Sequence, residues 1–130
     1  MNLLRSICFT LAVLSGVSCL DLPDKAESPL DPLSPNYVPT SPIVYVYARS
    51  RTKVDVTWSD RSLGETGFEI VRSQRIDGGY VTIATVAADV AVYSDTSSMF
   101  VARQVYYYRV RAFTPTAYGE WSNEGIGRIP

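Results

Sequence analysis

The sequence predicts an all-β domain, folded as an antiparallel sandwich of about seven strands. The clearest observation is the run 105–112, in which two sets of side chains alternate: Tyr106, Tyr108, Val110 and Ala112 against Tyr107, Arg109 and Arg111. Successive side chains of a strand point to opposite faces, so this alternation is typical of a half-buried strand. In addition, short β-rich runs recur from Ile43 onward between turn-rich gaps, without sustained helical periodicity.

The expected strands follow one another in a regular order. The first begins near Ile43, the second covers Val54–Trp58, and the third follows the turn region 64–67. Asp77-Gly78-Gly79 predicts a hairpin, because these residues tolerate positive φ. The remaining strands are expected at Tyr80–Val86, Val92–Thr96, Val105–Phe113 and Glu120–Ile129. The residues predicted to fill the space between the two sheets are Val44, Val46, Val54, Val56, Trp58, Phe68, Ile70, Tyr108 and Val110.

The N-terminus predicts an export signal over residues 1–18. One positive charge in Met1–Arg5 precedes the apolar run Ile7–Val17, which is shorter than the roughly 20 residues that a bilayer span needs. Small residues then lead to Cys19. This segment resembles a bacterial lipoprotein signal, although Gly16 stands where that family prefers leucine. The resemblance implies that Cys19 is lipidated and anchors the chain to a membrane; cleavage without lipidation, giving a secreted protein, is the alternative.

Residues 19–42 are expected to form a proline-rich linker between the lipid anchor and a folded domain at 43–130. Six of the eight prolines lie between Leu20 and Pro42, and acidic residues outnumber the single Lys25 there. Proline favours extended backbone in itself and in the residue before it. The segment is therefore interpreted either as a stalk, reaching on the order of 70 Å at about 3.1 Å per residue, or as a linker with no required length.

Three blocks of sequence resemble a fibronectin type III domain over Pro42 to Pro130. They are Val54-Asp55-Val56-Thr57-Trp58, Glu65-Thr66-Gly67-Phe68-Glu69-Ile70-Val71-Arg72-Ser73, and Tyr106-Tyr107-Tyr108-Arg109-Val110-Arg111-Ala112. The resemblance implies an immunoglobulin-like sandwich in which Tyr106 takes the tyrosine-corner position and bonds backbone upstream. Phe100 would pack under that tyrosine. Ala102-Arg103 stands where the family usually has Pro-Gly.

Six residues form the candidate binding surface: Tyr45, Tyr47, Tyr107, Arg109, Arg111 and Trp121. Exposed tyrosines suit carbohydrate stacking or protein contact, since the ring supplies area and the hydroxyl a polar end. Trp121 lies in a segment that resembles a degenerate Trp-Ser-x-Trp-Ser box of cytokine receptors, which implies a cation–π contact with an arginine of the 105–113 strand. Glu69 is expected to pair with Arg109 or Arg111, and the same face is then mainly bracing.

Composition excludes several classes of function. The formal net charge of −1 argues against nucleic acid as a partner. The chain has no histidine, and both cysteines precede residue 20, so the folded part lacks the commonest general base, metal ligand and nucleophile. Asp60, Glu65 and Asp95 are expected at turns. We therefore expect no catalytic residues, no metal and no cofactor.

The function predicted from the sequence is that of a non-catalytic cell-envelope lipoprotein. It would present a single binding or spacer module to a protein or glycan of the envelope, held at the membrane by its lipid. A secreted, unlipidated adhesive or accessory domain is the alternative, and a small hydrolase is the least favoured class.

Overall fold

The computed structural model describes residues 32–33 and 37–130. The predicted signal peptide, Cys19 and most of the predicted linker therefore lie outside the described residues. The chain divides into two compact units, of which the second is Val38–Pro130. Among the described residues, no helix has the length and apolar character needed to cross a bilayer.

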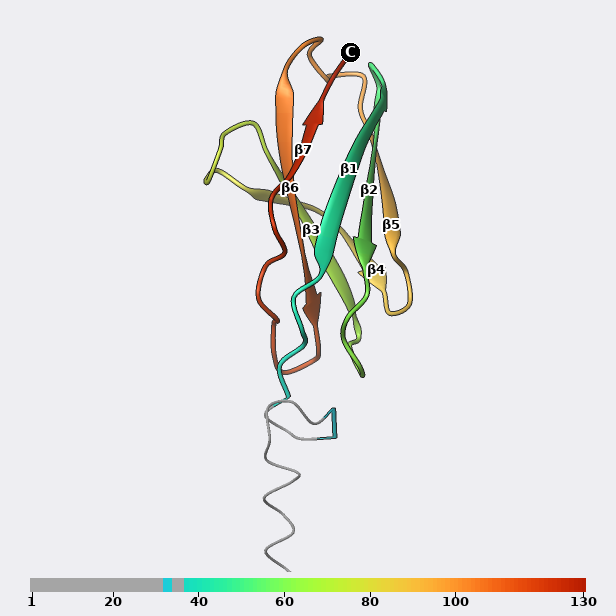
Figure 1. The fold of residues 1–130 in the computed structure, drawn as a ribbon, viewed down its shortest axis with the longest axis vertical. Helices are drawn as coiled ribbons and strands as arrows, with labels where there is room; N and C mark the ends of the chain where they lie inside the picture. The colour runs from blue at the N-terminus through green and yellow to red at the C-terminus, as the bar shows by residue number, and fades with distance from the viewer. Residues whose placement is uncertain (1–31, 34–36) are drawn as a thin grey trace, which may run out of the picture. The chain divides into compact units, whose positions relative to one another are not determined.

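The described residues form seven strands in two antiparallel sheets (Figure 1), as predicted. One sheet has the order β1-β2-β5, and its strands are β1 (Ile43–Ser50), β2 (Lys53–Ser59) and β5 (Val92–Thr96). The other has the order β4-β3-β6-β7, and its strands are β3 (Gly67–Ser73), β4 (Val81–Ala87), β6 (Val105–Phe113) and β7 (Gly125–Arg128). The sandwich thus has β2 in the middle of one sheet, and β3 and β6 in the middle of the other.

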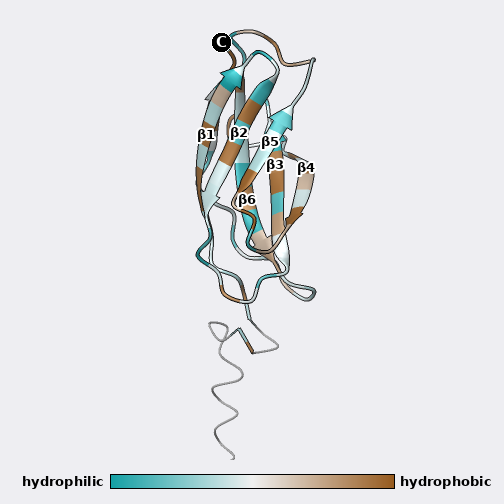
Figure 2. Ribbon diagram, turned by 90° about the vertical axis from the view of Figure 1, so that its right-hand side faces the viewer, coloured by the Kyte–Doolittle hydropathy of each residue, from teal (hydrophilic) through white to brown (hydrophobic). Residues whose placement is uncertain are grey.

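Alternation along the central strands decides which face is buried. In β6 every second residue from Tyr106 to Ala112 is at most 1% exposed, whereas the residues between them are only half-buried. The same period of two runs through β2, and Figure 2 shows the resulting apolar and polar bands along β1 and β2. Because the period matches the pleat, one face of each strand turns toward the facing sheet.

The predicted core is confirmed. Trp58 and Phe68, from different sheets, place their ring centroids 5.5 Å apart. Val46 is only partly buried but packs against this cluster. The buried cluster consists of Val44, Val54, Val56, Trp58, Phe68, Ile70, Phe100, Tyr106, Tyr108, Val110, Ala112 and Ile129. Tyr106 and Ala112 belong to the same face of β6 as Tyr108 and Val110, and Phe100 and Ile129 add to the cluster from outside the predicted set.

The tyrosine corner expected at Tyr106 is present. The backbone N–H of Val101 donates to the Tyr106 hydroxyl at 3.2 Å, and the Phe100 ring lies edge-on at 4.9 Å between centroids. The turn between them closes with the Gln104 N–H donating to the Val101 carbonyl at 3.1 Å, and Arg103 has φ +67°. Arg103 thus adopts the left-handed conformation for which the usual glycine of this turn is suited.

The last strand is shorter than the predicted run Glu120–Ile129, because side chains occupy the bonding positions before Gly125. The Ser122 hydroxyl accepts from the Val110 N–H at 3.0 Å. The Asn123 amide bonds both the N–H and the carbonyl of Val44, at 2.8 and 3.0 Å. Asn123 therefore ties the β6–β7 connection to β1 of the other sheet, and regular pairing starts only after it.

Glycine at 125 permits β7 to approach β1 closely. A Cβ at Gly125 would clash with the Val46 side chain and lie 2.8 Å from Val44 Cγ1. Both valines belong to the inner face of β1, so little room exists for them to move.

We predict that Gly125→Ala destabilises the domain by about 1–3 kcal/mol, because the added methyl overpacks the contact between β7 and β1. Gly78→Ala is the matched control, since a Cβ there meets nothing within 4 Å. Urea unfolding followed by tryptophan fluorescence measures both. Equal stabilities of the two variants would contradict the close approach.

Candidate functional site

The six residues of the candidate binding surface lie over the outer faces of different sheets. Tyr45 and Tyr47 lie on β1 of the three-stranded sheet. Tyr107, Arg109 and Arg111 alternate on β6 of the four-stranded sheet, and Trp121 lies in the β6–β7 connection beside them. The structure therefore brings four of the six together and separates them from the β1 tyrosines.

Arg111 makes the cation–π contact expected with Trp121. Its guanidinium carbon lies 4.2 Å from the Trp121 ring centroid and 3.8 Å from that of Tyr118. Its Nε donates to Glu69 Oε2 at 2.7 Å, which is the predicted ion pair across β3 and β6. The guanidinium is thus already held by two rings and a carboxylate.

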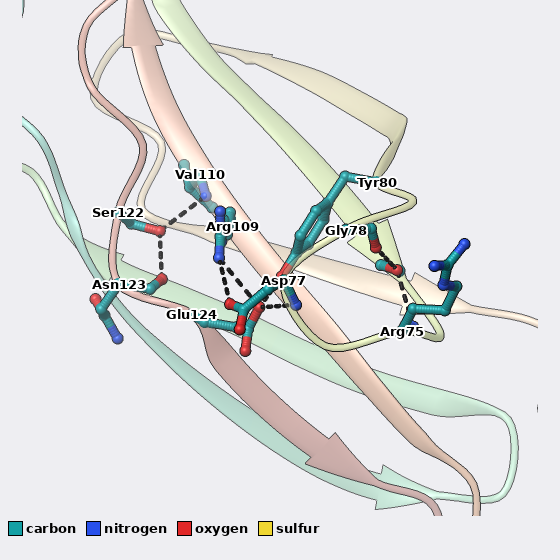
Figure 3. A network of polar contacts seen from close by, with 10 residues as sticks. Arg75, Asp77, Gly78, Tyr80, Arg109, Val110, Ser122, Asn123 and Glu124 are labelled. Carbon is teal, nitrogen blue, oxygen red and sulfur yellow. Dashed lines mark hydrogen bonds and ion pairs between the residues drawn. The ribbon is translucent and has the colours of Figure 1, made fainter.

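Arg109 is held by the β3–β4 connection and by Glu124 of the β6–β7 connection (Figure 3). Its guanidinium carbon lies 4.8 Å from the Tyr80 ring centroid, and its Nη2 pairs with Glu124 Oε2 at 3.2 Å and Asp77 Oδ1 at 3.3 Å. The Tyr80 hydroxyl also donates to Glu124. Burial, followed by this bond to a carboxylate, raises the pKa of Tyr80 well above its ordinary value. Glu124 therefore gathers donors from the β3–β4 connection and from β6 itself.

Tyr107 is half-buried and lies between Ser73 of β3 and Ile126 of β7 in the strand register. With Arg109 and Arg111 engaged beside it, this outer face is a network of internal contacts. Its charged groups are paired, and exchanging these partners for a ligand would cost the interactions that hold the hairpin and the β6–β7 connection.

The β1 tyrosines present a different surface. Tyr45 is 53% exposed and Tyr47 46%, and the neighbouring Ile43 and Val92 are 39% and 51% exposed. Tyr45 pairs with Thr57 of β2, which in turn pairs with Val92 of β5, so apolar side chains extend across this sheet. Arg49 stacks on the Tyr47 ring at 5.0 Å. This face is the more accessible of the two.

A buried ion pair between the sheets was not predicted. Asp95 was expected at a turn, but it lies within β5 and is 5% exposed. Its Oδ2 accepts from Arg72 Nη1 and from the Tyr108 hydroxyl, each at 2.8 Å. Burial, and then the neighbouring Asp95 charge, raise the pKa of Tyr108 far above its ordinary value. Strand alternation alone predicts that Tyr108 points inward. Its contact with Asp95 arises only because the two sheets pack face to face.

Three carboxylates from two connections meet at one end of the domain. Carboxylate oxygens of Asp60, Glu65 and Asp89 lie within 4.8 Å of one another. Burial raises the pKa of Glu65, and the charges of Asp60 and Asp89 add to the effect. The spacing in the sequence did not indicate the third member, because Asp89 follows β4 whereas the other two precede β3.

The order of the strands in the two sheets, with the tyrosine corner, defines the fibronectin type III fold. Solved structures agree with this assignment. A Fn3-like protein from Clostridium thermocellum is 28% identical with a TM-score of 0.60, over 71% of this chain and 94% of that one. Titin domains A168–A170 match at 19% identity and a TM-score of 0.60, over 71% of this chain and 32% of theirs. No family model matches the sequence, and no curated protein matches it.

Enzymes also contain domains of this fold. A β-1,2-glucanase from Parabacteroides distasonis matches at 17% identity and a TM-score of 0.58, over 74% of this chain but 14% of the enzyme. The fold suggests a binding or spacer module, and the particular function has to be argued from the surfaces of this chain.

We predict that Asp95→Ala destabilises the domain by about 3 kcal/mol, because the half-buried Arg72 guanidinium and the buried Tyr108 hydroxyl both lose their acceptor. Asp55→Ala is the control, since Asp55 pairs with Arg49 and Lys53 on the outer face and should cost about 1 kcal/mol or less. Urea unfolding measures the stability of both variants. A similar loss of unfolding free energy in each would show that the inter-sheet ion pair contributes no more than an ion pair on the outer face.

Proposed function

We propose that this protein is a non-catalytic lipoprotein of the cell envelope that presents one fibronectin type III-like module to an envelope partner. Lipid attached to Cys19 anchors the chain, and the proline-rich segment up to Pro42 joins the anchor to the folded unit. The module binds a protein or glycan through the β1 face of its three-stranded sheet.

The anchoring part of the proposal is supported by the sequence of residues 1–19. An apolar run shorter than a bilayer span, followed by small residues and Cys19, matches what a processed lipoprotein signal requires. Attachment of acyl chains would give membrane affinity without a spanning helix.

The observation that carries the binding part is the exposed aromatic face of β1. Tyr45 and Tyr47 leave about half of their surfaces open on a strand whose opposite face is packed into the core. Large apolar side chains gathered on an exposed face are characteristic of contact surfaces, and tyrosine contributes much area for little conformational entropy.

The charged groups of the described residues support a non-catalytic module. Along the outer face of β6, Arg109 and Arg111 are paired with carboxylates and stacked on rings. Lys53, which a serine–lysine nucleophile would need, pairs with Asp55 at 3.4 Å. These groups are engaged in structure, so none is poised as an activated nucleophile or base.

We predict that Cys19→Ser shifts the full chain from the membrane fraction to the soluble fraction of a bacterial host, because the anchor is lost. Cys8→Ser is the control and should remain in the membrane fraction, since Cys8 lies in the part that is removed. Membrane retention of the Cys19→Ser protein at unchanged size would exclude lipidation as the anchor and favour another mode of export.

We predict that replacing Tyr45 and Tyr47 with serine lowers capture of envelope components by about tenfold or more, since buried aromatic side chains dominate contact energies. Ile76→Ser with Val81→Ser is the matched control, because these residues are 65% and 64% exposed on another part of the domain. Cross-linking and quantitative affinity capture compare the two. Equal capture by both variants would mean that the β1 face is not the contact.

A further inference from the structure

Positive charge gathers at one end of the folded unit, although the net charge of the chain is close to zero. The β1–β2 turn, the β5–β6 connection and the end of β7 lie at the same end (Figure 1). They carry Arg51, Arg103 and Arg128 respectively, and Lys53 begins β2. We call these four residues the basic end. Among the described residues, none of its three arginines forms an ion pair with a carboxylate.

The carboxylates that lack ion pairs lie elsewhere. Asp60 and Glu65 lie in the β2–β3 connection, and Asp89 lies in the β4–β5 connection, at the opposite end of the strands. Opposite charges are thus segregated along the strand direction. Within the basic end Lys53 pairs with Asp55 at 3.4 Å, whereas the three arginines pair with no carboxylate of the described residues, so the field there attracts anions.

A shallow cleft lined by hydroxyl groups opens at the basic end. Its volume is about 430 Å³, and it is lined by Ser50, Thr52, Lys53, Thr96, Ser97 and Ser98. The Thr52 carbonyl accepts from the Ser97 N–H at 3.0 Å, so the β1–β2 turn and the β5–β6 connection are held together as its two walls. Arg51 is exposed in the turn between two of the lining residues. The cleft thus combines several hydroxyl groups with the unpaired Arg51 beside it and with Lys53, which also pairs with Asp55 at 3.4 Å.

We propose that this cleft binds an anionic glycan, a polysaccharide that carries carboxylate or phosphate groups. Hydroxyl side chains donate and accept, as the hydroxyls of a sugar require, while the unpaired Arg51 supplies the main charge that neutralises the oxyanion. The volume lies within the range of pockets that hold small organic groups, which suits one or two sugar units of a longer chain. Neither Tyr45 nor Tyr47 of the β1 aromatic face lines the cleft.

An anionic bilayer is the competing partner. Met99 and Val101 are 85% and 59% exposed on the β5–β6 connection, and apolar side chains beside cations also suit a lipid surface. The glycan is favoured because serine and threonine line five of the six positions around the cleft. Lipid headgroups do not present the continuous row of hydroxyl groups with which these serine and threonine side chains could form hydrogen bonds.

This inference rests on the proposed function in one respect: an anionic envelope glycan is met only if the chain is exported. The lipid-anchor proposal and the glycan-binding proposal can be disproved independently of each other. Binding to a purified polysaccharide does not depend on Cys19, and membrane partition of the Cys19 variants does not depend on the cleft.

The test is titration of the purified full chain with alginate, followed by amide chemical shifts and by calorimetry. We expect binding that weakens as salt is added, with shifts centred on Thr52, Ser97 and Ser98. Arg51→Ala should weaken binding about fivefold, in line with the loss of one exposed ionic contact. Arg61→Ala is the matched control, an exposed arginine in the β2–β3 connection, and should change affinity less than about twofold.

Four outcomes would overturn the proposal. Equal binding of neutral dextran would remove the anionic requirement, and binding to phosphatidylglycerol vesicles without alginate binding would assign the basic end to a membrane. Equal effects of Arg51→Ala and Arg61→Ala would indicate general charge attraction. Shifts centred on Tyr45 and Tyr47 would place the glycan on the β1 face.

Discussion

The carboxylate of Asp95 joins the two sheets through the middle of the sandwich. It extends from β5 and meets Arg72 of β3 and the Tyr108 hydroxyl of β6, each at 2.8 Å. Arg72 also stacks over the rings of Phe100 and Tyr106, at 5.3 and 5.7 Å. A buried charge is tolerated only when donors satisfy it, so the positions of β3, β5 and β6 depend on one another.

This constraint extends to the tyrosine corner. The ring of Tyr106 lies beneath Arg72, and its hydroxyl bonds the backbone of Val101 at the start of the turn after Phe100. The β5–β6 connection is therefore held from the core side by the same group that pairs with Asp95. Because that connection also forms one wall of the hydroxyl-lined cleft, the ion pair between the sheets supports the shape of the proposed binding site.

The outer surfaces of the two sheets differ in how many of their side chains are engaged in internal contacts. On the four-stranded sheet, Glu124 and Glu69 collect the arginines of β6, and aromatic rings cover the guanidinium groups. On the three-stranded sheet, Tyr45 and Tyr47 remain open. A module with one self-contained face and one open face can bind without disturbing its own fold, because the residues available for contact carry little of the internal bonding.

The sequence by itself determined the fold class, the strand pattern, most of the core and the tyrosine corner. The strand pattern and the core follow from period-two alternation and local turn chemistry, which nearby residues encode, whereas the tyrosine corner was implied by the resemblance of residues 106–112 to a fibronectin type III strand. Strand faces also predicted that Glu69 pairs with Arg109 or Arg111, and the resemblance to a Trp-Ser-x-Trp-Ser box implied that one of these arginines stacks on Trp121; the structure selects Arg111 in both cases. Only the tertiary structure decided that Asp95 is buried, that Arg109 meets Tyr80, and that Asn123 holds β1. Each of these contacts joins segments distant in the chain, so their partners depend on how the two sheets and their connections face each other, which no local pattern records.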